Sequence, residues 1–244
     1  MWTEKQINQH IKASKILHKI RDSAISFMKN NSNCSEEQVR LQIISQFKEH
    51  NLITSHNSPI VAFNENSANP HYIPTNMSKK IKLGTIIKLD IWARVNEINA
   101  PYADLTWMAY KGARIPKKVQ EIFEIVINSR DQVIKELKFS LKNGTLLKGK
   151  ELDNIAREYI SRKGYSQKFI HSLGHSLGLK SPHGKYGGLK KSNFRKIHKN
   201  LGYTIEPGIY LNGKFGIRSE IDFYINKQNK LILTCPLQKK IIRF

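Results

Sequence analysis

The sequence contains few cysteines and no long apolar run. Its only two cysteines are Cys34 and Cys235, and neither belongs to a Cys-x-x-Cys pair or a Cys/His zinc motif. This scarcity favours a reducing compartment and two structural thiols. No run of about eighteen apolar residues occurs, and the first residues lack the apolar core of a signal peptide. We therefore expect no membrane-spanning helix and a cytoplasmic location.

Acidic residues are scarce beside basic ones. The chain has 19 Asp and Glu against 41 Lys and Arg, which gives a net charge of +22. Such an excess normally suggests nucleic acid or another anionic surface as a partner. However, the lysines are spread over the whole chain, and no zinc-finger, RNP or basic-zipper pattern is present. Abundant Lys, Ile and Asn could equally reflect a compositional bias, so we expect weak attraction to phosphate without a specific nucleic-acid partner.

The composition is otherwise that of a globular protein. Of the 244 residues, 39% are hydrophobic and 25% are charged, which is ordinary for a folded domain with a large core. No short-period repeat and no low-complexity linker divides the chain. We expect one domain over residues 1–244, with a helical N-terminal part, 1–55, integral to it.

Two capping boxes mark the starts of helices near the N-terminus. Thr3 and Gln6 form the first, and apolar residues then recur at helical spacing as far as Met28. Ser35 and Gln38 form the second, ahead of another amphipathic stretch. The sequence therefore predicts two successive helices before the first strand.

The rest of the chain mixes strand and helix patterns. Residues 84–93 and 102–108 are rich in β-forming side chains, and the turn residues between them predict a β-hairpin. We expect further strands at 59–63, 203–209, 216–224 and 231–234, a polar loop at 64–69, and helices at 118–141 and 151–163. This order predicts an α+β fold, with helices packed on one side of a curved antiparallel sheet.

One short stretch holds three histidines, His171, His175 and His183, separated mainly by small and apolar residues. On a strand, even-numbered separations keep side chains on one face, so we expect His171 and His175 to point into the same cavity. The glycine at 174 leaves room for a ligand or another backbone. A lone histidine is usually structural, but imidazole is also a common metal ligand, and matching carboxylates occur elsewhere.

Four carboxylates stand inside otherwise apolar strand patterns: Asp90, Asp104, Glu206 and Glu220. One such group is ordinarily explained by hydrogen bonds or a salt bridge. Four are harder to explain without cations, because like charges without a metal raise one another's pKa and become protonated. Two divalent ions would balance four negative charges. Carboxylate oxygens with one imidazole suit manganese, iron, cobalt or zinc.

The candidate ligands follow one another in the order Asp90, Asp104, His175, Glu206 and Glu220. With the Gly-His pair that ends at His175 and the Glu-Pro-Gly that begins at Glu206, this order resembles the pita-bread metallopeptidases. That group includes Xaa-Pro aminopeptidase, prolidase and methionine aminopeptidase. The resemblance covers essentially the catalytic domain, from about residue 59 to 236, and implies a curved antiparallel sheet with pseudo-twofold symmetry and flanking helices.

The resemblance also implies a centre with two divalent metal ions, most often manganese, with cobalt, iron or zinc as alternatives. Asp90 would chelate one ion, Asp104 and Glu220 would bridge both, and His175 and Glu206 would hold the second. Paired cations lower the pKa of bound water, which then attacks the peptide carbonyl. Glu206 would also shuttle a proton to the leaving amine.

Four further residues match positions of the family around the substrate. His71 matches a histidine near the substrate, and His183 matches one that contacts the scissile group and stabilises the oxyanion. His171 begins a His-Ser-Leu-Gly-His run that looks like the HGLGH pattern of Xaa-Pro enzymes, where it lines the proline pocket. Arg218 resembles the arginine of their GIRIE-type strand; its alternative role is to hold a carboxylate.

Two spacings depart from the family pattern. Asp104 stands fourteen positions after Asp90, more than in typical members, so the hairpin needs a longer tip or a bulge. His183 stands one position further from His175 than usual, with Pro182 before it. Both differences could reshape the specificity pocket.

Three functional hypotheses follow. The leading one is a dinuclear metal-dependent aminopeptidase or dipeptidase that acts on short peptides, with proline in the second position. Methionine aminopeptidase is the alternative within the same class, because by size the chain looks more like that enzyme. A non-catalytic basic module that binds RNA, ribosome or protein is the alternative from another class. A monomer and a homodimer both remain open.

Overall fold

The structure is a computed structural model that describes residues 1–55, 58–75 and 78–244. Its α-helices are α1 (Glu4–Asn30), α2 (Glu36–Glu49), α3 (Lys117–Lys142) and α4 (Gly149–Arg162), and short 3-10 helices are η1 (Asn64–Ala68) and η2 (Ser166–Lys168). Its strands are β1 (Leu52–Ile53), β2 (Ile60–Phe63), β3 (Ile86–Val95), β4 (Ala103–Tyr110), β5 (Gly174–Leu177), β6 (His183–Leu189), β7 (Gly202–Ile205), β8 (Gly208–Leu211), β9 (Phe215–Arg218), β10 (Ile221–Ile225), β11 (Leu231–Leu233) and β12 (Ile242–Arg243). Among the described helices, none combines the length and apolarity needed to cross a membrane.

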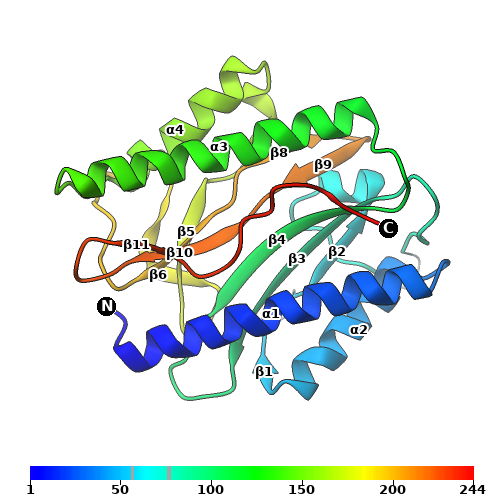
Figure 1. The fold of residues 1–244 in the computed structure, drawn as a ribbon, viewed down its shortest axis with the longest axis horizontal. Coiled ribbons are helices and arrows are strands. Elements are labelled where there is room, and N and C mark those ends of the chain that lie inside the picture. Colours follow the sequence, from blue (N-terminus) through cyan, green and yellow to red (C-terminus); the bar gives the residue numbers. More distant parts are fainter. Residues whose placement is uncertain (56–57, 76–77) are drawn as a thin grey trace.

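The N-terminal half is built from α1, α2 and the strands that they cover (Figure 1). Both predicted capping boxes form: the Thr3 and Ser35 hydroxyls accept from the backbone N–H groups of Gln6 and Gln38, whose side chains bond back to the cap backbone. Leu17 on α1 packs with buried strand residues such as Leu89 in one hydrophobic core. The caps thus fix where the helices start, and burial of their apolar faces holds them on the sheet.

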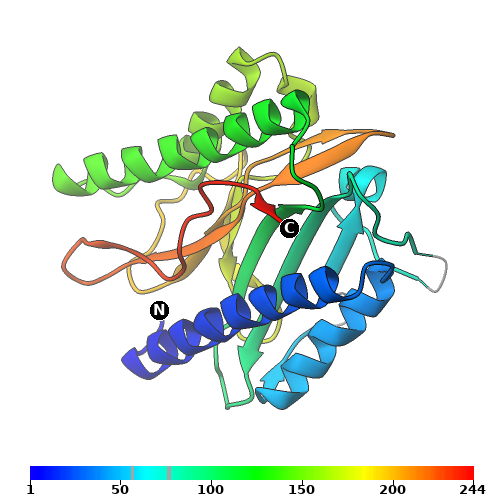
Figure 2. The same cartoon turned by 45° about the vertical axis from the view of Figure 1, so that its right-hand side comes forward.

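The C-terminal half repeats this plan with α3, α4 and a second set of strands. Phe123 on α3 and Leu152 on α4 belong to a separate core that includes Ile205 and Phe223. In both views the two helix pairs lie on opposite sides of the molecule, with the strands between them (Figure 2). Two halves, each made of a helix pair on a mainly antiparallel sheet, give the expected pseudo-twofold arrangement.

The strands form two five-stranded sheets and a ribbon. The first sheet has the order β1-β3-β4-β12 with β2 also on β3; the second has the order β11-β10-β7-β5-β6; and β8 pairs with β9. The pairs are antiparallel except that of β12 with β4. Strands β9 and β10 contact β4, which joins the C-terminal strands to the first sheet.

Two strand predictions were too long, and one loop prediction was wrong. The expected strand at 203–209 divides into β7 and β8 at Pro207, which has no N–H to donate to a sheet ladder. The expected strand at 216–224 divides into β9 and β10 at Ser219, whose N–H donates to the carbonyl of Pro207. The expected polar loop at 64–69 instead contains the 3-10 helix η1.

The β3–β4 hairpin has a long tip rather than a bulge. Its register runs without a shift, and it pairs Asp90 with Thr106 and Trp92 with Asp104. The additional residues lie between β3 and β4. Because Asp104 and Thr106 are two positions apart, their side chains share one face of the sheet with that of Asp90.

A buried carboxylate, Glu36, ties α2 to the segment after β2. It accepts hydrogen bonds from the backbone N–H of Phe63 (2.6 Å), the Asn66 amide, the Tyr72 hydroxyl (2.7 Å) and the backbone N–H of Lys79 (2.9 Å). Every partner is a donor, and Glu36 is fully buried. The carboxylate therefore acts as an acceptor-only hub that an amide cannot replace.

We expect Glu36→Gln to lower the free energy of unfolding by about 1–3 kcal/mol, because its NH₂ group would face donors in a buried site. Glu4→Gln is the matched control, since Glu4 is an exposed acid in the first turn of α1. It should change stability by no more than about 0.5 kcal/mol. Urea titration measures both variants, and equal effects would contradict the role of Glu36.

Buried His18 on α1 makes the fold sensitive to acid. Its Nδ1 lies 2.6 Å from Arg21 Nη1, and its ring packs edge-on against Trp107. Burial, assisted by the charge of Arg21, lowers the pKa of His18 from 6.5 to about 4. The unfolded chain therefore takes up this proton first. The stabilisation from neutral His18 is present above pH 6.5 and is lost as the pH falls toward about 4.

We expect His18→Gln to flatten the acid limb of the stability curve. Between pH 6.5 and about 4, the unfolding free energy should change less steeply with pH in the variant. The decrease in slope should correspond to at most one bound proton. One proton corresponds to about 1.4 kcal/mol per pH unit. Denaturant titrations of both proteins across this range provide the measurement. An identical slope would mean that His18 takes up its proton equally in the folded and unfolded chains.

Candidate metal centre

The candidate site lies where the two halves of the fold meet. Thr106 on β4 and Glu220, between β9 and β10, form an isolated antiparallel bridge, and the N–H of Glu220 donates to the carbonyl of Thr106 at 3.2 Å. Nearby, the N–H of Asp104 donates to Asp222 Oδ2 at 2.8 Å. These bonds join the N-terminal hairpin to the C-terminal strands. They therefore bring carboxylates from both halves to one place.

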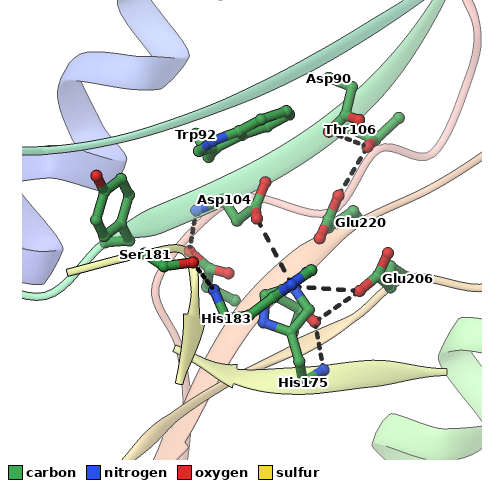
Figure 3. Close-up of polar contacts among 12 residues, drawn as sticks. Asp90, Trp92, Asp104, Thr106, His175, Ser181, His183, Glu206 and Glu220 are labelled. Atoms are coloured by element: carbon green, nitrogen blue, oxygen red, sulfur yellow. Dashed lines mark hydrogen bonds and ion pairs between the residues drawn. The ribbon is translucent and has the colours of Figure 1, made fainter. Parts of the chain in front are cut away.

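Asp104, His175 and Glu220 form the centre of the site (Figure 3). One ligand atom from each lies within 4.8 Å of the others. His175 Nε2 is 3.8 Å from Asp104 Oδ2 and 3.5 Å from Glu206 Oε1. On the other side of the ring, Nδ1 lies 3.1 Å from the carbonyl of Ser176. That contact favours a proton on Nδ1 and leaves Nε2 free to bind a metal.

Asp90 joins this cluster through a hydroxyl and a guanidinium. Thr106 Oγ1 lies 3.0 Å from Asp90 Oδ1 and 2.7 Å from Glu220 Oε2 (Figure 3). Arg218 bonds directly to the other oxygen of Asp90 and donates to Thr106 Oγ1 at 2.9 Å. It also lies 3.8 Å from Glu206 and 3.9 Å from Glu220. Arg218 therefore provides the positive charge nearest to these carboxylates and orients Asp90.

Burial of so many acids strongly affects their protonation. Burial, and then the charge of Glu220, raise the pKa of Asp104 well above its ordinary value. Burial and Glu206 raise the pKa of Glu220, although Arg218 opposes this shift. Burial raises the pKa of Glu206 to about 7 against the effect of Arg218. Like-charged carboxyls are thus held where only added positive charge would keep all of them ionised.

The donor set fits divalent metal ions. Within the described residues, Asp104 Oδ1 is buried without a hydrogen-bond partner, which is costly unless a cation binds it. Burial lowers the pKa of His175 to about 3, so its imidazole stays neutral and available as a ligand. Hard carboxylate oxygens combined with one neutral imidazole are suited to manganese, iron, cobalt or zinc.

The cluster opens into a cavity of about 370 Å³. All five predicted metal ligands line it, together with His71, His183 and Arg218. The ring of His183 packs at 73° to that of His175, with centroids 4.1 Å apart. An apolar wall is formed by Ile60, Pro70, Ile73, Trp92 and Pro182. A pocket lined by convergent polar groups together with apolar side chains is suited to a small ligand.

The expectation that His171 and His175 share one strand face is wrong. The strand β5 begins only at Gly174, where a Cβ would stand 2.2 Å from the carbonyl oxygen of Thr204. His171 lies before it, with Nε2 2.8 Å from the Tyr210 hydroxyl, and it is not among the described residues that line the cavity. A role for His171 in substrate binding stays a prediction.

Among the side chains that contact the predicted residues, those of Thr106, Tyr210 and Asp222 were not predicted. Thr106 had a usable signal, because it stands two positions after Asp104 and so faces the same side of the strand. Asp222 is a further acid in an apolar strand, two positions after Glu220, and was detectable in the same way. Tyr210 had no such signal, since its contact with His171 joins residues far apart in the sequence.

Comparisons with known proteins agree with this geometry. An uncharacterized peptidase of Staphylococcus aureus strain MRSA252 is 28% identical over 232 residues, which cover 95% of this chain and 62% of that protein. The X-Pro aminopeptidase from Thermotoga maritima MSB8 superposes with a TM-score of 0.87 at 28% identity, covering 100% of this chain and 64% of that one. The prolidase from Thermococcus sibiricus superposes with a TM-score of 0.84 at 27% identity, covering 100% of this chain and 62% of that one.

These likenesses confirm the predicted pita-bread fold, and the chain spans 62% of the length of the curated relative above. Residues 8–227 match the model for metallopeptidase family M24. The chain therefore belongs to metallopeptidase family M24.

Proposed function

We propose that this chain is a dinuclear metal-dependent exopeptidase that hydrolyses the N-terminal bond of short peptides, with proline preferred in the second position. The observation that carries the proposal is the cluster of Asp104, His175 and Glu220, with Asp90 and Glu206 beside it, on one cavity. Similarity to an X-Pro aminopeptidase and a prolidase supports the preference for proline.

Five residues would hold the two ions. They are Asp90, Asp104, His175, Glu206 and Glu220, all of which line the cavity. Manganese is the preferred candidate, with cobalt, iron and zinc as alternatives that share this ligand type. When bound, divalent ions lower the pKa of water and polarise a peptide carbonyl.

The chain's own residues would orient the peptide and move protons. Glu206 is almost fully buried at the cavity wall, where its carboxylate could take a proton and pass it to the leaving amine. His183 and His71 line the same cavity, where each could donate a hydrogen bond to the reacting peptide. Arg218 would keep Asp90 oriented, and its long contacts to Glu206 and Glu220 would limit their mutual repulsion.

Removal of initiator methionine is the second candidate function. It is favoured by the position of His171 outside the cavity and by the apolar wall that includes Ile60 and Trp92. Such a wall could accept an unbranched apolar side chain. A non-catalytic basic module is the third possibility, and the net charge of +22 is the observation in its favour. Metal content separates the module from both enzymes.

A peptide panel tests the proposal. The protein would be loaded with manganese, and in separate samples with cobalt, iron or zinc. Each sample would be incubated with Ala-Pro, Ala-Pro-Ala and Met-Ala-Ser, and the products would be identified by mass spectrometry. Loss of the residue before proline is the expected result, and cleavage of Ala-Pro would add dipeptidase activity. Release of methionine alone would favour the second candidate. No cleavage with any of the four metals would refute the peptidase proposal.

A further inference from the structure

One fully buried lysine has no place in the mechanism above. Lys88 lies on β3, two positions before Asp90 and on the same face of the strand. Its Nζ donates to the carbonyl oxygens of Ser67 (3.1 Å) and Asn69 (2.9 Å). Burying a lysine is costly, so a lysine that binds two carbonyls in this position has a specific structural purpose.

Both carbonyls belong to the segment that leads to His71. Asn69 is held twice: its carbonyl accepts from Lys88, and its Oδ1 accepts from the backbone N–H of His71 at 2.9 Å. Pro70 stands between them and restricts the backbone further. A short path of hydrogen bonds therefore leads from Lys88 through Asn69 to His71, at the rim of the metal cavity.

The carbonyl of Ser67 is enclosed by another strand. The N–H of Gly216 on β9 donates to Ser67 Oγ at 2.8 Å. A Cβ at Gly216 would lie 2.2 Å from the Ser67 carbonyl oxygen, so the two backbones are in close contact. Ser67 is fully buried, and Lys88 supplies its carbonyl with a donor. The end of η1 is thus fixed by β3 on one side and by β9 on the other.

We propose that Lys88 is a positioning residue that fixes His71 at the rim of the metal cavity by holding the carbonyls of Ser67 and Asn69. This inference rests on the proposed function, in which His71 contacts the substrate. Lys88 itself does not line the cavity among the described residues. Its hydrogen bonds to the carbonyls of Ser67 and Asn69 connect it to the cavity through the backbone that carries His71.

A double-mutant cycle separates this role from a general structural one. We expect Lys88→Met to lower kcat/KM by about tenfold to a hundredfold, because displacement of a substrate-contacting group by about 1 Å has effects of that size. In a His71→Ala background the same change should have less than about a twofold effect. Lys82→Met, at an exposed lysine, is the matched control and should leave kcat/KM unchanged. Equal losses from Lys88→Met in both backgrounds would overturn the proposal.

A second measurement does not depend on activity. In protein labelled with ¹⁵N-histidine, the His71 ring resonances, assigned by their loss in His71→Ala, should shift or broaden in Lys88→Met. Lys88→Gln, whose shorter side chain is not expected to reach both carbonyls, should have the same effect if Lys88→Met fails to fold. The resonances of His10, which is buried against the carbonyl of Tyr102, should stay in place.

The kinetic measurement and the histidine resonances distinguish failure of the proposed function from failure of the positioning role of Lys88. If the wild-type protein cleaves no peptide, the proposed function fails, and the His71 resonances still decide whether Lys88 holds this segment. If the wild-type protein is active but the His71 resonances are identical in wild type and in the folded Lys88 variant, the positioning role is overturned.

Discussion

Replacing Glu206 with glutamine is expected to lower kcat by about 10³-fold or more, because one change removes both a proton carrier and a charged metal ligand. Glu206 is buried, and its Oε1 lies 3.5 Å from His175 Nε2 and 3.1 Å from Thr204 Oγ1. Glutamine has almost the same shape and can still accept from Thr204, so the fold should persist. The glutamine amide, however, can neither take up nor release a proton near neutral pH.

Steady-state kinetics on Ala-Pro-Ala would measure this loss, with circular dichroism to confirm folding. Glu158→Gln is the matched control, since it makes the same chemical change at an exposed position on α4. It should keep full activity. Turnover of Glu206→Gln within twofold of wild type would refute the assignment of Glu206 as both metal ligand and proton carrier.

Removal of divalent metal is expected to abolish activity and to destabilise the fold. Burial and mutual repulsion raise the pKa values of Asp104, Glu206 and Glu220 in the metal-free site. An acid whose pKa is raised in the folded state contributes its full stabilisation below the pKa of the unfolded state. This contribution is lost as the pH rises through the pKa of the folded state. The metal-free site is therefore strained near neutral pH, and bound cations should relieve that strain.

Calorimetric melting of chelated protein, with and without added manganese, would test this expectation. At about 100 to 1,000 times the Kd, binding should stabilise the fold by about 3–4 kcal/mol. The effect should be larger near about pH 8 than near about pH 6, because binding displaces protons. The double variant Asp104→Asn/Glu220→Gln should lose this response, and an equal response in that variant would place the ions elsewhere.

Local patterns predicted most of the fold. The capping boxes at Thr3 and Ser35 formed as expected, because a cap depends only on residues three positions apart. The β3–β4 hairpin formed for a similar reason, since alternating side chains and turn residues are local signals. The break at Pro207 was missed although proline is a local signal that interrupts a strand. The break at Ser219 depends on its contact with the carbonyl of Pro207, which the sequence does not show.

The candidate site was predicted in part. Residue type and order identified the carboxylates and His175, which the structure brings to one cavity. The position of His171 could not be predicted, because the start of β5 depends on the contact between Gly174 and Thr204. The contacts of Lys88 were equally hidden, since a lysine within an apolar strand pattern gives no sign of the carbonyls that it binds.

The central claim is that this junction binds two metal ions between the halves of the fold. The most direct measurement is anomalous diffraction from crystals grown with manganese and recorded at its absorption edge. We predict two anomalous peaks in the cavity, in contact with the carboxylates of Asp104 and Glu220, and no such pair in the Asp104→Asn/Glu220→Gln variant. The absence of peaks in the wild-type cavity, or peaks only at surface positions, would contradict a dinuclear centre and with it the proposed peptidase mechanism.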